Sequence, residues 1–253
     1  MMLSLVKTVL AALPFSAGAG PLAFSFEERK LPARMQEDAN GVLCSPCISL
    51  GSQGINILLN YVLNAGVVGG CGELCGHLTT KTEQEVCNLA CDVVGIKAFI
   101  KALNHTDLDP FYFCETVQAC PKPPDTADAQ IVGVKAMPSS IEKGDSIQLE
   151  CDMSVMNATG IGEFRLSVSG PVTAAVSQGF VLAKGIPEGP QALAVKLTVQ
   201  DDTSGDEPVV WNAGTYTFEF EVCQGECGSK HPHSKVFGKS SGNFTLTEAL
   251  LVV

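Results

Sequence analysis

Apolar residues recur at the spacing of an amphipathic helix in the first half of the chain. The first stretch contains Ile48, Ile55, Leu58, Leu59, Val62 and Leu63, and the second contains Val86, Leu89, Ala90, Val93, Val94, Ile96, Phe99, Ile100 and Leu103. Thr82 is followed three residues later by Glu85, which fits a capping box at a helix start. A short helix is expected in "DPFYFCETVQAC", so residues 44–120 are predicted to be helical.

Beyond residue 129 the apolar residues alternate with polar ones, as in half-buried strands. Four segments show this alternation: "SIQLECDM", "EFRLSVS", "ALAVKLTV" and "TYTFEFEV". Turn-forming triplets such as Lys143-Gly144-Asp145 and Asn212-Ala213-Gly214 separate them. Several short strands of this kind predict an Ig-like β-sandwich over residues 129–253. A segment of this length is large enough for a core of its own.

The first residues have the pattern of a secretory signal peptide. Lys7 precedes an apolar run from Thr8 to Phe15, and Ala17-Gly18-Ala19 resembles a cleavage site. A membrane anchor is the alternative, but the run is shorter than the roughly 20 residues that span a bilayer. We therefore expect residues 1–19 to be removed and the protein to be secreted or extracellular, with a lysosomal or vesicle lumen as the alternative.

The cysteines divide the chain. Eight of the eleven lie between Cys44 and Cys120, and the proline-rich "CPKPPDTAD" follows directly. We expect an N-terminal linker at 20–43, a helical domain at 44–120, a linker at 121–128 and a β domain at 129–253. In an oxidising compartment most of these cysteines are expected to form disulfides.

Cys71, Cys75, Cys87 and Cys91 form two pairs with a spacing of four residues. Residues four apart share one helix face, so two antiparallel helices would join Cys75 to Cys87 and Cys71 to Cys91. A zinc or redox site is the alternative. Such sites prefer two intervening residues, a spacing that occurs here in Cys44-Ser45-Pro46-Cys47 without a surrounding βαβ pattern.

The order of six cysteines between Cys44 and Cys120 resembles that of the saposin B-type domain. The resemblance implies the pairs Cys44–Cys120, Cys47–Cys114 and Cys75–Cys87. The segments "KTEQEVCNLACDVVGIKAFIKAL", "DLDPFYFCETVQACP" and "CQGECGSKHPHS" are together similar to the countin family. Its members are secreted, with one saposin B-type domain and a β-rich tail, and the founding members belong to a secreted factor that limits the size of multicellular groups.

This resemblance implies a disulfide-stapled helical domain with an apolar face that is covered by lipid, a membrane surface or a second copy of the chain. An ordinary closed core is the alternative. The candidate lipid-binding residues are Ile55, Leu58, Leu59, Val62, Leu63, Val93, Ile96, Phe99 and Ile100.

Three cysteines remain in the β domain. We favour a Cys223–Cys227 disulfide that closes the "CQGEC" loop, with Cys151 as a buried free thiol. The first alternative is an inter-sheet disulfide from Cys151. The second is a metal site that uses Cys223 and Cys227 with His231 and His233, although secretion favours the disulfide.

Three sequons, at Asn104, Asn157 and Asn243, indicate a glycoprotein. The net charge of −11 argues against nucleic acid as a partner. The sequence has no G-x-S-x-G, H-E-x-x-H or phosphate-loop motif, and neither His77 nor His105 has an evident nucleophile partner. We therefore expect no catalytic activity, no cofactor and no bound metal.

The function predicted from the sequence is that of a secreted, non-catalytic glycoprotein with a lipid- or membrane-interacting helical domain, similar to countin-type extracellular signals. Protein partners in an extracellular complex and a homodimer through the helical domain are further expectations. The alternatives are a membrane-perturbing, pore-forming effector and an activator protein for lipid hydrolysis.

Overall fold

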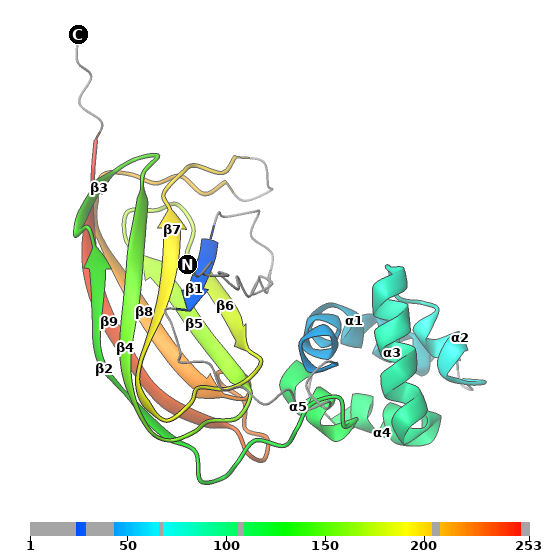
Figure 1. Ribbon diagram of the computed structural model, residues 1–253. Coiled ribbons are helices and arrows are strands. Elements are labelled where there is room, and N and C mark those ends of the chain that lie inside the picture. The colour runs from blue at the N-terminus through cyan, green and yellow to red at the C-terminus, as the bar shows by residue number, and fades with distance from the viewer. Residues whose placement is uncertain (1–23, 29–42, 66–67, 106–108, 204–207, 249–253) are drawn as a thin grey trace, which may run out of the picture.

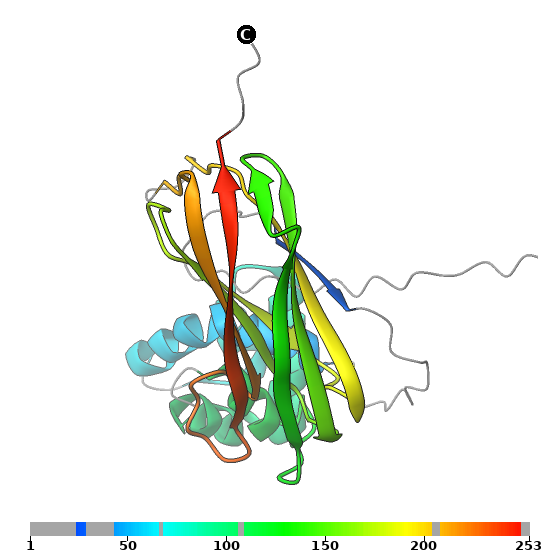
Figure 2. The same ribbon diagram turned by 90° about the vertical axis from the view of Figure 1, so that its left-hand side faces the viewer.

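The computed structural model describes residues 24–28, 43–65, 68–105, 109–203 and 208–248 (Figure 1). The predicted signal peptide lies outside these residues. Two β-sheets form most of the structure, and a smaller group of helices lies beside one end of them (Figures 1 and 2).

The two sheets contain nine strands in the described residues. The first sheet has the order β1-β7-β4-β2 and the second β3-β9-β8-β5-β6. All neighbouring strands are antiparallel except β3 and β9, which are parallel. The strands are β1 (Phe24–Glu28), β2 (Asp128–Met137), β3 (Ser140–Glu142), β4 (Ser146–Asn157), β5 (Gly162–Ser169), β6 (Val176–Leu182), β7 (Gly189–Thr198), β8 (Gly214–Gln224) and β9 (Lys235–Thr247).

A single hydrophobic core lies between the sheets. The four segments predicted from alternation are β4, β5, β7 and β8, and the apolar positions of each face this core. Aromatic rings fill the centre, since Phe164 stacks on Phe220 with ring centroids 4.7 Å apart. Tyr216 stacks on Phe244 at 5.2 Å. Sheet pairing and aromatic packing therefore hold this part together.

The helical part contains α1 (Cys44–Ala65), α2 (Cys71–Cys75), α3 (Lys81–Val94), α4 (Ile96–His105) and α5 (Pro110–Thr116). The apolar stretch from Val86 to Leu103 is divided between α3 and α4 at Gly95, whose φ of 80° favours glycine. A second hydrophobic core, centred on Phe99 and Phe113, lies among these helices. None of the helices in the described ranges is long and apolar enough to cross a membrane.

The predicted fold class, an all-α saposin-like domain followed by an Ig-like β-sandwich, is wrong. The chain is mostly β, with two sheets and a small helical part. Strand β1 precedes the helices in sequence, yet it pairs with β7 from Phe24↔Leu197 to Glu28↔Leu193. Along the chain, the helices therefore come between β1 and β2, which belong to the same sheet. The sequence did not reveal this because five residues of β1 carry little periodic signal.

The start of α3 also differs from the prediction. The capping box is formed by Thr80 and Glu83, two residues earlier than the predicted Thr82 and Glu85. The Thr80 hydroxyl accepts a hydrogen bond from the Glu83 N–H at 3.2 Å, and the Glu83 carboxylate accepts one from the Thr80 N–H at 2.9 Å. Both threonines are followed by glutamate at the required spacing, so the sequence alone does not distinguish them.

This difference gives a test of the helix start. Replacing Thr80 with alanine is expected to lower the free energy of unfolding of the helical part by about 1 kcal/mol, because the Glu83 N–H loses its acceptor. Thr82→Ala is the matched control and should change it little, since Thr82 is exposed within the first turn. Thermal unfolding followed by far-UV circular dichroism measures both. An equal loss in the two variants would contradict this cap assignment.

Candidate functional site

Disulfides fix the helical part. The described residues contain Cys44–Cys120, Cys47–Cys114, Cys71–Cys91, Cys75–Cys87 and Cys223–Cys227. The first two join the beginning of α1 to α5 and the turn that follows it. The next two join α2 to α3 as two adjacent rungs. These four are the pairs that the resemblance and the hairpin geometry implied, whereas Cys223–Cys227 lies in the β part.

The candidate lipid-binding residues do not form one exposed face. Ile55, Leu58 and Phe99 are at most 2% exposed and belong to the helical core. Four more are partly buried against this core: Leu59, Val62, Ile96 and Ile100. Leu63 and Val93 are 75% and 62% exposed. Much of the predicted set is therefore ordinary core, the alternative that the sequence left open.

Two exposed apolar side chains lie on one side of α3. Leu89 is 51% exposed and lies four residues before Val93, so both side chains are on the same helix face. The next helix, α4, carries exposed Lys97 and Lys101, also four residues apart. We call these four residues the α3–α4 surface. Leu89 belonged to the apolar stripe of the sequence, but periodicity did not separate it from its buried neighbours.

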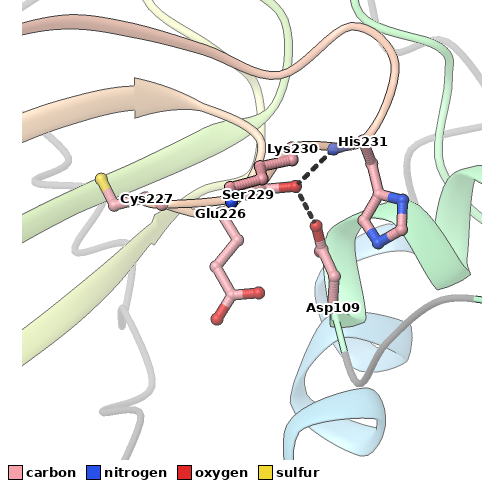
Figure 3. A pocket seen from close by; sticks show the side chains of 7 residues that line it. Asp109, Glu226, Cys227, Ser229, Lys230 and His231 are labelled. Atoms are coloured by element: carbon pink, nitrogen blue, oxygen red, sulfur yellow. Dashed lines mark hydrogen bonds between the residues drawn. The ribbon is translucent and has the colours of Figure 1, made fainter.

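A second candidate site lies where the helices meet the sheets. It is a pocket of about 470 Å³ between the start of α5 and the segment that joins β8 to β9 (Figure 3). Its lining is mostly polar, and the residues come from parts of the chain more than 100 positions apart. They are Asp109, Glu226, Cys227, Gly228, Ser229, Lys230 and His231.

Asp109 is the centre of this pocket. As the N-cap of α5, its Oδ1 accepts hydrogen bonds from the N–H groups of Phe111 and Tyr112 at 2.9 and 3.0 Å. Its Oδ2 accepts a hydrogen bond from the Ser229 hydroxyl at 2.5 Å (Figure 3). The Tyr112 ring stacks on the His231 ring with centroids 4.1 Å apart. One helix start is thus joined to the β8–β9 segment by a hydrogen bond and a ring stack.

Two glutamates at this junction have raised pKa values. Burial, together with the charge of Asp109, raises the pKa of Glu115 to about 7. Burial and the charges of Asp109 and Glu163 raise the pKa of Glu226 to about 7. Protonation of both carboxyls therefore changes near neutral pH.

The pocket does not have the hydrogen-bond pattern of an activated serine. A nucleophilic hydroxyl gives its proton to a base that releases it again during the reaction. The Ser229 hydroxyl donates to Asp109, a carboxylate already held by two backbone N–H groups, and accepts from the His231 backbone N–H at 3.2 Å. This arrangement fits a structural clasp better than a catalytic site.

Comparison with known proteins places the chain in a family. Residues 42–118 match the Countin N-terminal domain, and residues 129–250 match the Countin C-terminal domain. The chain belongs to the countin family. The first match covers the helical part from α1 to α5, and the second covers β2 to β9. Strand β1 lies outside both matches.

This countin-family chain is similar to several proteins of Dictyostelium discoideum. It is similar to Countin-1, with 31% identity over 81% of this chain and 78% of Countin-1. It is similar to Countin-3, with 32% identity over 80% of this chain and 89% of Countin-3. Countin-2 is 30% identical over 84% of this chain and 82% of Countin-2. Each alignment is longer than either matched domain.

Two of the three cysteines of the β part form a disulfide, and the third is free. Cys223 and Cys227 form a disulfide, so neither offers a thiolate to the metal site that the sequence left as an alternative. Cys151 is a buried free thiol, and burial raises its pKa to about 12. Cys223 is only 2% exposed because a bulge after Val222 shifts the β8–β9 register. Strict alternation along β8, in which Val222 faces inward, would place Cys223 on the outer face.

The three sequon asparagines are exposed in this countin-family chain. Asn104 lies near the end of α4. Asn157 ends β4 and donates a hydrogen bond to the Thr126 carbonyl at 3.0 Å. Asn243 lies on β9 and accepts a hydrogen bond from the Thr217 hydroxyl at 2.9 Å. Each side chain is accessible for modification.

Proposed function

We propose that this chain is a secreted, non-catalytic glycoprotein of the countin type that acts outside cells through contact of its helical part with a lipid or membrane surface. Its role resembles that of extracellular factors that regulate the size of cell groups. The sheets offer a second surface to protein partners in an extracellular complex.

The observation that carries the proposal is the α3–α4 surface. Leu89 and Val93 expose large apolar side chains, and burying such a side chain is worth about 1.5–3 kcal/mol. Lys97 and Lys101 lie on the next helix and attract anionic headgroups. Apolar side chains beside lysines are typical of helices that lie in the membrane interface. The surface lies within the residues that match the Countin N-terminal domain.

Secretion is supported by the cysteine chemistry. Disulfides persist in extracellular and lumenal compartments and are rare in the cytosol. The described residues contain five of them. The exposed sequon asparagines agree with passage through the same compartments.

Vesicle binding tests the proposal. The variant Leu89→Asp/Val93→Asp is expected to bind anionic phospholipid vesicles at least about tenfold more weakly than the unaltered chain, because two apolar anchors become charges. Flotation of vesicles with and without an anionic lipid measures the bound fraction.

The matched control is Val132→Asp/Val236→Asp, which places the same two charges on exposed valines of β2 and β9, 60% and 48% accessible. It should bind like the unaltered chain. If the unaltered chain ignores both vesicle types, or if the control loses binding equally, the α3–α4 surface is not a membrane contact.

A further inference from the structure

The helical part and the sheets have separate hydrophobic cores. Among the described residues, only Ile161 of the β side belongs to the core among the helices, and Val181 packs against it. No described residue of the helices belongs to the core between the sheets. Figures 1 and 2 show the helices beside one end of the sheets, with α5 nearest to them. The two parts are therefore joined mainly by polar contacts.

These polar contacts form a short clasp. Asp109 receives the Ser229 hydrogen bond, and Tyr112 stacks on His231. The adjoining linker is held as well, because Nδ1 of His233 lies 2.6 Å from Oδ1 of Asp125. The Gln224 amide donates to the carbonyls of Pro124 and His233 at 3.1 and 2.8 Å.

Two carboxyl groups at this junction, those of Glu115 and Glu226, are not held by hydrogen bonds as Asp109 is. Within the described residues, neither Glu115 nor Glu226 accepts a hydrogen bond or forms an ion pair through its side chain. Glu115 is only 6% exposed. Asp109 and Glu226 line the same pocket, and Glu115 lies on α5, the helix that Asp109 caps, so three acidic groups share one junction. Ionising all three without compensation is electrostatically unfavourable.

We propose that the junction between α5 and the β8–β9 segment is a pH-sensitive clasp, closed in acid and loosened above neutral pH. This goes beyond the proposed function, because it concerns how the two parts of the molecule are held together and does not depend on lipid contact.

The direction follows from the charges around each group. Burial and Asp109 raise the pKa of Glu115, while His233 and Lys122 oppose the rise. Burial, Asp109 and Glu163 raise the pKa of Glu226, while Arg165 opposes it. A carboxyl with a raised pKa stabilises the closed state fully below its ordinary pKa, and this contribution is lost as pH rises to about 7.

Hydrogen exchange of the full-length secreted protein tests this clasp. The amides of α5 are compared with those of central β4 in the same sample. The intrinsic dependence of amide exchange on pH affects both helix and strand, so it cancels in the comparison. Between about pH 5 and about pH 8, the amides of α5 should exchange increasingly fast relative to those of β4. The expected increase is about tenfold for each unit by which closing the clasp raises the pKa of a carboxyl.

The variant Glu115→Gln/Glu226→Gln removes both charges with little change of shape and should lose most of this pH dependence. Glu85→Gln, an exposed position on α3, is the matched control and should keep it. The proposal is overturned if α5 of the unaltered chain is equally protected at both pH values. It is also overturned if the double variant keeps the full pH dependence. Should that variant fail to fold, the pH series of the unaltered chain still decides.

Discussion

Replacing Phe220 with alanine is expected to lower the free energy of unfolding of the sheets by about 3–5 kcal/mol. Phe220 is fully buried in the middle of β8. Its ring stacks on Phe164 at 4.7 Å and meets the edge of Phe218 at 5.6 Å. Truncation therefore removes apolar burial and two ring contacts, and the paired strands around the site leave little freedom to close the cavity.

The fluorescence of Trp211 measures this loss. It is the only tryptophan of the chain, and it is 1% exposed in the core between the sheets. Denaturant unfolding of Phe220→Ala should shift the tryptophan transition and leave the far-UV signal of the helices nearly unchanged. Val236→Ala, 48% exposed on β9, is the control and should cost less than about 0.5 kcal/mol. A helical transition that shifts with the tryptophan signal would show that the two cores unfold together.

Much of the sheet core was predictable from the sequence, but the sheet topology was not. In β4, β5, β7 and β8 every second residue is large and apolar, so alternation identifies both strand and inner face. Strand β9 reads "KVFGKSSGNFTLT", where glycine and serine hide the same alternation. Strand β1 is short and separated from its partner β7 by the whole helical part. Local patterns do not report pairing across such a distance.

The candidate sites were predictable to different degrees. The helical stripe contains both Ile55, which is buried, and Leu63, which is exposed, because periodicity defines a helix face but not what covers it. The clasp was not predictable. Asp109 and Ser229 are 120 positions apart, and each alone resembles an ordinary cap or turn residue. The sequence singled out His231 and His233 only as ligands of an alternative metal site, whereas Ser229 beside them contacts a helix start.

Removing both Cys44–Cys120 and Cys47–Cys114 is expected to destabilise the helical part by about 7 kcal/mol, which is enough to unfold it. The two bonds close loops with sequence separations of 76 and 67 residues. In the chain-entropy account, closing the first long loop is worth about 4.5 kcal/mol. Once it is closed, the second bond closes a circuit of only about ten residues, because the paired cysteines are neighbours, and is worth about 2.7 kcal/mol.

The same reasoning predicts strong non-additivity. Replacing either pair alone with alanine should cost only about 2.7 kcal/mol, since the remaining bond still holds the ends of the long loop together. The double removal should therefore exceed the sum of the two single-pair losses by nearly 2 kcal/mol. Denaturant unfolding followed by far-UV circular dichroism measures all three variants. Cys151→Ala, which deletes a buried thiol without breaking a bond, is the control for lost side-chain volume. Additive losses would contradict this account. They would mean that residual structure, and not the covalent loop, sets the entropy of the unfolded helical part. The two disulfides would then stabilise the fold through local packing around α1 and α5.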